Sequence, residues 1–128
     1  MKKIFPLLAL FCIALFADVK YIDIFDAYDE AKKEHKIVMV MLSQEGCPSC
    51  EYMEDVVFNN TNIAETLERR FVVVHVDVYK DGVPDGLEFF ATPTFYFLDS
   101  NEKVLKKFTG GQNAKDFADT LKAVKIKN

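Results

Sequence analysis

The sequence IVMVMLSQEGCPSC, residues 37–50, decides the fold. It begins with six apolar residues in a row, and continuous rather than alternating apolarity predicts a central strand buried on both faces. The polar turn SQEG at 43–46 ends that strand. Cys47 and Cys50 follow, three positions apart. The cysteine pair therefore falls where a central strand gives way to a helix.

Cys47 occupies a position that favours the thiolate form of its side chain. The carboxyl end of a strand is where α/β folds place their chemistry. At the start of a helix, free backbone N–H groups and the positive end of the helix dipole also point at the sulfur. Because the thiolate is the form that attacks disulfides, we expect Cys47 to be the nucleophile. Pro48 suits the first helical turn, where no hydrogen-bond donor is lost.

Cys50 lies three residues further along the same helix, so its side chain falls on the same face as Cys47. The two sulfurs can close a small disulfide or open to a dithiol. We expect Cys50 to be the more buried cysteine and to resolve the mixed disulfide that Cys47 forms with a substrate. Gly46, Pro48 and Ser49 are the expected supporting residues around the pair.

The rest of the chain alternates helices and strands. Helices are predicted over 23–35, after Cys47, from a capping box at Asn62 and Glu65, and from Asn113. The predicted strands cover 37–42, 71–76, 94–98 and 103–108. Helices join the first two strands, which should therefore be parallel, whereas the last two form an antiparallel hairpin. The prediction is an α/β fold, with a four-stranded mixed β-sheet flanked by helices on both faces.

The first 17 residues have the layout of a secretory signal peptide. Lys2 and Lys3 precede the apolar run 4–16, and Ala17 closes that run before Asp18. We expect cleavage after Ala17, which leaves residues 18–128 as one domain in the periplasm. A retained membrane anchor is the alternative, but the run is shorter than the ~20 residues that a spanning helix needs.

Cleavage would change both the charge and the cysteine count. It removes two lysines, which moves the formal charge from −4 to −6, and an acidic domain repels phosphate backbones. We therefore expect no nucleic-acid partner. Cleavage also removes Cys12, which leaves Cys47 and Cys50 in an oxidising compartment. Their loop is too short to stabilise a fold usefully, so the pair is chemical rather than structural.

Metal binding is the main competing chemistry for a pair of cysteines. A structural zinc site needs four ligands, and neither His35 nor His75 has ligand spacing to the cysteine pair. We therefore predict no metal site. A Cu or Zn carrier that uses only the two thiolates remains an alternative function.

A second motif, ATPTF at 91–95, places a proline just before an aromatic strand. With the cysteine pair, it resembles the thioredoxin superfamily, and the stretch 47–77 is similar to small periplasmic thioredoxin-like proteins and to the C-terminal domain of DsbD. The resemblance covers about residues 24–124. It implies a thioredoxin-like fold, in which Pro93 is cis and faces the disulfide. It also implies that the backbone of Thr92 pairs with an extended substrate peptide.

The resemblance also implies a function: reduction of disulfides in exported proteins, with electrons from a membrane thiol donor of the DsbD type. The redox-active disulfide would need no other cofactor, and we expect a monomer. A disulfide oxidase or isomerase is the alternative within the same class. The chain departs from thioredoxin in two places. Gly46 stands where thioredoxin has tryptophan, and Met41 stands where it has a buried carboxylate, while Glu45, Glu51 and Glu54 flank the site.

Overall fold

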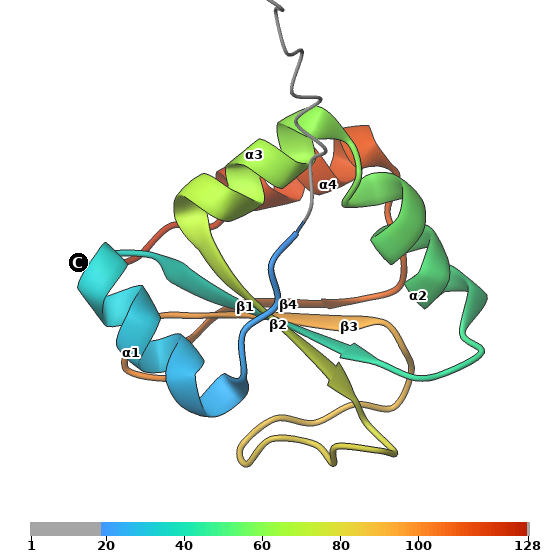
Figure 1. The fold of residues 1–128 in the computed structure, drawn as a ribbon, viewed down its shortest axis with the longest axis horizontal. Helices are drawn as coiled ribbons and strands as arrows, with labels where there is room; N and C mark the ends of the chain where they lie inside the picture. The colour runs from blue at the N-terminus through green and yellow to red at the C-terminus, as the bar shows by residue number, and fades with distance from the viewer. Residues whose placement is uncertain (1–18, 128) are drawn as a thin grey trace, which may run out of the picture.

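A four-stranded mixed sheet forms the centre of the computed structural model, which describes residues 19–127 (Figure 1). The strand order is β2-β1-β3-β4. Strand β1 pairs with β2 in parallel and with β3 antiparallel, and β3 pairs antiparallel with β4. The strands are β1 (Ile37–Ser43), β2 (Phe71–Asp77), β3 (Thr94–Leu98) and β4 (Val104–Thr109). The predicted fold class and strand directions are confirmed.

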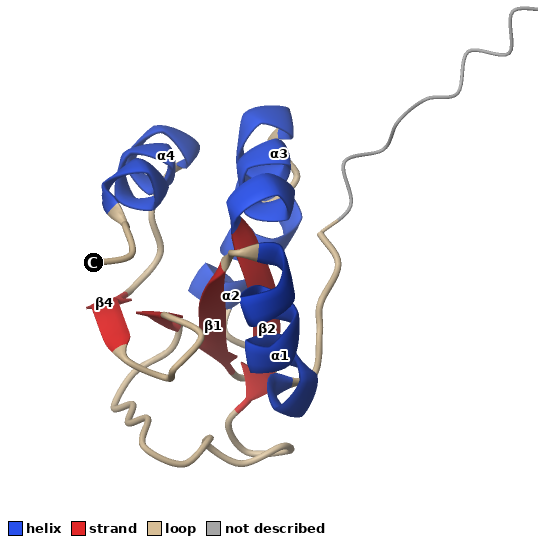
Figure 2. Cartoon of the chain, turned by 90° about the vertical axis from the view of Figure 1, so that its left-hand side faces the viewer, coloured by secondary structure: helices blue, strands red, loops and turns tan. Residues whose placement is uncertain are grey.

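Helices cover both faces of this sheet. They are α1 (Ile24–Glu34), α2 (Pro48–Tyr52), the π-helical turn η1 (Met53–Val57), α3 (Thr61–Arg70) and α4 (Ala114–Ala123). Buried residues of α1 pack on one face, and those of the other four elements pack on the opposite face. Figures 1 and 2 show α3 and α4 at the top of the molecule and α1 lower down.

The alternation of side chains along β1 divides the core into two clusters. Met39 and Met41 point into the cluster that also contains Cys47 and Cys50. Val38 and Val40 point into the cluster beneath α1. Every residue of β1 is buried, so both faces of the strand need apolar side chains. This is why the run at 37–42 is continuous rather than alternating.

Two local features differ from the sequence prediction. The N-cap of α3 is Asn60, whose side-chain oxygen accepts from the N–H groups of Asn62 and Ile63, so the capping box expected at Asn62 and Glu65 is wrong. The helix after Cys50 also continues as η1, in which the N–H of Phe58 donates to the carbonyl of Met53. A π-helical turn inserts a single wider turn into an otherwise ordinary helix, which is too short to leave a sequence pattern of its own.

The proposed signal peptide, residues 1–17, lies outside the described residues. Within residues 19–127, no helix is long and apolar enough to cross a membrane. The described members of the two core clusters run from Val19 to Val124.

Candidate active site

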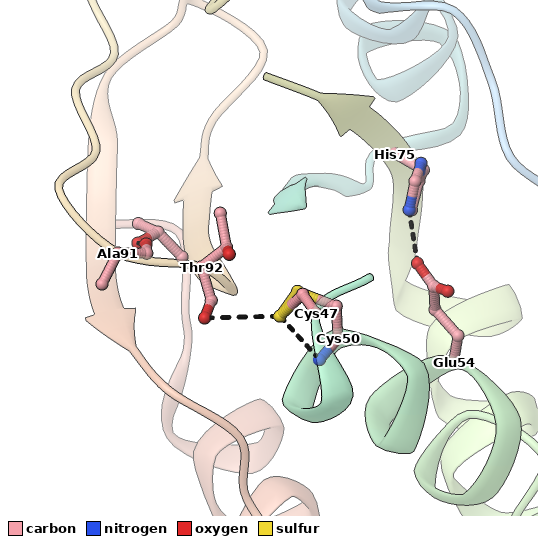
Figure 3. The surroundings of a disulfide bond; sticks show 7 residues. Cys47, Cys50, Glu54, His75, Ala91 and Thr92 are labelled. Atoms are coloured by element: carbon pink, nitrogen blue, oxygen red, sulfur yellow. Dashed lines mark hydrogen bonds and ion pairs between the residues drawn. A yellow bond between two sulfur atoms is a disulfide. The ribbon is translucent and has the colours of Figure 1, made fainter. Parts of the chain in front are cut away.

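A disulfide joins Cys47 and Cys50 at the end of the loop that follows β1 (Figure 3). Their Cα atoms are 5.2 Å apart. Cys47 is the N-cap of α2, Pro48 lies in the first turn, and Cys50 lies within the helix. Gly46 precedes them with a φ of +74°, a left-handed conformation that a side chain would disfavour. The loop thereby turns directly from the buried strand into the helix.

The two sulfurs differ in their surroundings. Cys47 is 6% exposed and Cys50 is 1% exposed, so Cys47 is the more accessible of the two. The backbone N–H of Cys50 donates to the sulfur of Cys47 at 3.2 Å. That donor would also stabilise a thiolate on Cys47 after reduction. Ser49 is exposed on the outer side of the helix.

The loop before β3 lies against the disulfide. The carbonyl oxygen of Thr92 is 3.6 Å from the sulfur of Cys47, and the Thr92–Pro93 peptide bond is cis. Two further bonds fix this loop: the Thr94 hydroxyl donates to the carbonyl of Ala91 at 2.7 Å, and Gly110 N–H donates to the carbonyl of Pro93 at 2.8 Å. The structure thus brings the two sequence motifs, 45 residues apart, to one place.

The segment after β4 completes the other wall of the site. The N–H of Gln112 donates to the sulfur of Met53 at 3.3 Å. A Cβ atom on Gly111 would lie 3.7 Å from the Cβ of Ser49, which is ordinary van der Waals contact. Sequence analysis did not assign this segment to the site, because neither glycine nor a backbone N–H carries a chemical signature.

Ion pairing anchors the loop that carries Gly46 and Cys47. The carboxylate of Glu45 lies 2.9 Å from the ammonium of Lys80, just beyond β2. The hydrogen bond with Glu45, together with its negative charge, raises the pKa of Lys80. Hydrogen bonds from the N–H groups of Lys80 and Tyr79 lower the pKa of Asp77, which ends β2. The turns after β1 and β2 therefore hold each other in place.

A second polar pair lies near the disulfide, on the side away from Thr92 (Figure 3). Nε2 of His75, on β2, is bound to the carboxylate of Glu54, on η1. The two side chains are 30% and 27% exposed. Sequence analysis named Glu54 as a flanking carboxylate but missed its partner, which is 21 residues away on another element.

The site can therefore carry out thiol–disulfide exchange. It presents one accessible sulfur and one covered sulfur in a closed disulfide, beside a loop that offers its backbone. Within residues 19–127, no group of three His, Cys, Asp or Glu side chains is placed to hold a metal ion.

Solved structures with this architecture include thioredoxins. A thioredoxin from Thermus thermophilus is 28% identical with a TM-score of 0.70, over 84% of this chain and 87% of that one. The DsbH oxidoreductase is 17% identical with a TM-score of 0.66, over 86% and 87% of the two chains, a likeness of fold alone.

Sequence comparison gives a short match to a curated protein and a match to a family model over most of the chain. Spermatogenesis-associated protein 20 of Rattus norvegicus is 38% identical over 52 residues, which are 41% of this chain and only 7% of the rat protein. Residues 24–125 match the family described as the thioredoxin-like domain. The chain, with its Cys47–Cys50 disulfide, belongs to the thioredoxin-like family.

Proposed function

We propose that this protein is an exported reductase of disulfides in other periplasmic proteins. The Cys47 thiolate attacks one sulfur of the substrate disulfide, and the other sulfur leaves as a thiolate. The mixed disulfide is then attacked by Cys50, which closes the Cys47–Cys50 disulfide and releases the second substrate sulfur. Two electrons pass to the substrate, and two protons from the dithiol balance the two thiols formed.

The difference in exposure between the sulfurs supports the two roles. A substrate disulfide can reach the sulfur of Cys47, whereas Cys50 is almost completely covered by α2 and the core. Thr92 is partly exposed and its carbonyl oxygen lies beside the sulfur of Cys47, where a substrate strand could pair with this backbone. This placement of one accessible sulfur against the Thr92–Pro93 loop is the observation that carries the proposal.

The electrostatics around Cys47 favour the reducing direction. A dithiol oxidises its partners strongly when its thiolate is well stabilised. Here Pro48 and Ser49 between the cysteines carry no charge, and the flanking charged residues Glu45 and Glu51 are acidic. The ammonium of Lys80 is paired with Glu45. The acidic neighbours offset part of the stabilisation that the helix start and the Cys50 N–H give to the Cys47 thiolate. Weaker stabilisation of the thiolate favours the closed disulfide and makes the dithiol a better reductant.

A periplasmic reductase needs a continuous supply of electrons. An oxidising compartment would otherwise leave the protein in its disulfide form. We propose that a membrane thiol donor of the DsbD type reduces Cys47–Cys50, and that the signal peptide at 1–17 directs the chain to that compartment.

The reduction potential tests this proposal. The domain from Asp18 onward is equilibrated with glutathione buffers, and the oxidised fraction is measured by thiol alkylation and mass spectrometry. A Cys50→Ser variant, which cannot close the internal disulfide, is the control. A potential near or below about −250 mV is expected of a reductase, whereas a value above about −180 mV would make the protein an oxidant or isomerase. If Cys47 and Cys50 form no disulfide at any ratio of reduced to oxidised glutathione, tight stoichiometric binding of Cu(I) would instead support a metal carrier.

A further inference from the structure

The outer face of the helix that carries Cys50 presents two exposed apolar side chains. Tyr52 ends α2 and is 42% exposed, and Val56 lies in η1 and is 55% exposed. They are four positions apart, a spacing that places side chains next to each other on one helical face. Met53 and Val57, which follow them directly, are fully buried and hold the opposite face in the core. The fold therefore leaves Tyr52 and Val56 outside the core.

Acidic side chains border this apolar pair. Glu51 and Asp55 are both exposed on the same helix. Within residues 19–127, their carboxylates and the hydroxyl of Tyr52 have no hydrogen-bond or ion-pair partner. From residue 37 to residue 68, the chain contains six acidic residues and no lysine or arginine. The outer face of α2 and η1 thus combines an apolar centre with unpaired negative charge.

This face lies within reach of a protein that reacts with Cys47. A helix rises about 1.5 Å per residue, which places Tyr52 roughly 8 Å and Val56 roughly 13 Å along the axis from Cys47. An interface of ordinary size covers about 800 Å² of each partner, which corresponds to a disc of roughly 16 Å radius. One partner can therefore contact Tyr52 and Val56 while its own thiol meets the sulfur of Cys47.

The face differs from the side on which a substrate strand is proposed to pair. Figure 3 shows Thr92 on one side of the disulfide, whereas the helix runs from Cys50 toward Glu54 on the other side. Pairing at Thr92 uses backbone groups, which every polypeptide has, so it suits varied substrates. Tyr52, Val56 and the two carboxylates are particular side chains, which suit a partner that always docks in one orientation. In the proposed cycle, the electron donor is that constant partner.

Charge decides between the possible occupants of this face. A second copy of the chain would bring two acidic faces together, and like charges placed opposite each other weaken binding. An anionic membrane surface would be repelled for the same reason. A protein surface with lysine or arginine around an apolar centre is complementary, because these cations can pair with Glu51 and Asp55.

We propose that the electron donor docks on the outer face of α2 and η1, with Tyr52 and Val56 at the centre and with its basic residues opposite Glu51 and Asp55. The inference rests on the proposed function, in which a membrane dithiol reduces this protein. A donor thiolate attacks the Cys47 sulfur, and the Cys47–Cys50 bond breaks with its electron pair on Cys50, which takes up a proton. The second donor thiol then loses its proton and attacks the first donor sulfur. This closes a donor disulfide and releases Cys47 as a thiolate, so two electrons have passed to the protein.

Spheroplasts of the cells that make this protein provide the test. They keep the cytoplasmic supply of electrons and expose the outer side of the inner membrane. Oxidised protein without residues 1–17 is added, and thiol alkylation with mass spectrometry follows the reduction of its disulfide. For Tyr52→Ala and for Val56→Ser, we expect an initial rate about tenfold lower than that of the unchanged protein. Asp55→Lys should be slowed to a similar degree, because it places a cation opposite the basic residues of the donor.

Small reagents separate docking from the chemistry of the disulfide. Dithiothreitol, a dithiol that needs no docking surface, should reduce every variant within twofold of the unchanged rate. The reaction of each reduced variant with the small aromatic disulfide DTNB should likewise stay within twofold. Circular dichroism and thermal unfolding establish that each variant is folded.

Val104→Ser and Asp29→Lys are the matched controls. Val104 is 46% exposed on β4 and pairs with Leu98, at the end of the sheet away from the disulfide. Asp29 is exposed on α1. Spheroplasts should reduce both controls within twofold of the unchanged rate. Raising the salt concentration from about 50 to 500 mM should slow the unchanged protein more than Asp55→Asn, because salt screens the charge pairs.

The proposal is overturned if spheroplasts reduce Tyr52→Ala and Val56→Ser as fast as Val104→Ser. It is also overturned if dithiothreitol reduces these variants equally slowly, because the effect would then lie in the disulfide. Slower reduction of a polypeptide disulfide by the same variants would assign the face to substrates. A dimer that Val56→Ser dissociates would assign it to a second copy. Failure of spheroplasts to reduce even the unchanged protein would contradict the donor in the proposed function, and the docking surface with it.

Discussion

Arg70, at the end of α3, donates a hydrogen bond to the backbone carbonyl of Val124, at the end of α4, at 2.6 Å. The other arm of the guanidinium donates to the carbonyl of Leu121 at 2.7 Å. Leu121 lies in the last turn of α4 and Val124 is its C-cap, and carbonyls at this end have no partners within the helix. The side chains of Leu121 and Val124 are buried in the cluster with the disulfide. One arginine thus fixes the end of α4 over the core that supports the active site.

Arg70→Lys should destabilise the protein by about 1–2 kcal/mol. A lysine keeps the charge but cannot place two donors in the fixed fork that reaches both carbonyls. The midpoint of urea unfolding measures the loss. Arg69→Lys, on an exposed neighbour, should change stability by less than about 0.5 kcal/mol. Equal midpoints for the two variants would show that the paired hydrogen bonds contribute nothing.

Tyr96 should prove important for the loop that precedes Thr92. Its hydroxyl donates to the carbonyl of Glu88 at 2.7 Å and accepts from the N–H of the same residue at 3.0 Å. Tyr96→Phe removes both bonds while the ring keeps its packing, so we expect a loss of about 1–2 kcal/mol. Faster amide hydrogen exchange near Glu88 would locate the effect. Tyr79→Phe, at a side chain 77% exposed, is the control and should leave both measurements unchanged.

The sequence was sufficient to predict the strands of the sheet and the location of the cysteine pair between β1 and the following helix. Every residue of β1 is buried, so its apolar run was unambiguous, and β3 has the bounds that its aromatic residues predicted. The order of helices and strands then determined which strands are parallel. These features follow from local sequence patterns, which tertiary packing does not alter here.

The cap of α3 and the Glu54–His75 pair could not be predicted in the same way. The segment 59–62 holds three asparagines, and only the extended backbone of Asn60 makes it the N-cap. The pairing of Glu54 with His75 depends on the β1–β2 register and on the path of η1. A charged residue on a helix and a histidine in a strand each suggest ordinary solvated positions until the tertiary structure brings them together.

Asp77 should make the stability of the folded domain depend on pH in the acidic range. Hydrogen bonds from the backbone of Lys80 and Tyr79 lower its pKa from the ordinary value of 3.8. Because the pKa of Asp77 is lower in the folded state than in the unfolded state, its carboxylate stabilises the fold at pH values above the pKa of the unfolded state. This stability is lost as the pH falls through the pKa of the folded state. Asp77→Asn should therefore lower the melting temperature at pH 7, with a difference that shrinks below about pH 4. Asp29→Asn, on exposed α1, should show no such trend.

Cleavage of the proposed signal peptide would lower the mass of the protein, and this change can be measured. Full-length protein expressed in a Gram-negative host should be recovered from the periplasm without residues 1–17 and should begin at Asp18. Intact-mass spectrometry of the periplasmic and membrane fractions tests this. Replacing Lys2 and Lys3 with glutamate should leave precursor in the cytoplasm, because the positive n-region is lost. Full-length protein in the membrane fraction would support a retained anchor instead.

Phe90 should contribute to the binding of polypeptide substrates. It is 86% exposed and lies two residues before Thr92, beside the path proposed for the substrate strand. Burial of part of an aromatic ring by a bound polypeptide would favour binding. For Phe90→Ser, we therefore expect KM for a polypeptide disulfide such as insulin to rise about fivefold, which corresponds to about 1 kcal/mol.

The same variant should leave the reaction with DTNB and the unfolding midpoint unchanged, because an exposed ring supports neither the disulfide nor the core. Phe25→Ser is the matched control: that ring is 88% exposed at the start of α1, whose buried side packs in the other core cluster. A rise in KM for both variants would indicate a general effect of surface hydrophobicity. An unchanged KM for Phe90→Ser would place substrate contacts on the opposite wall, around Gly111, where a bulkier residue could then be tested.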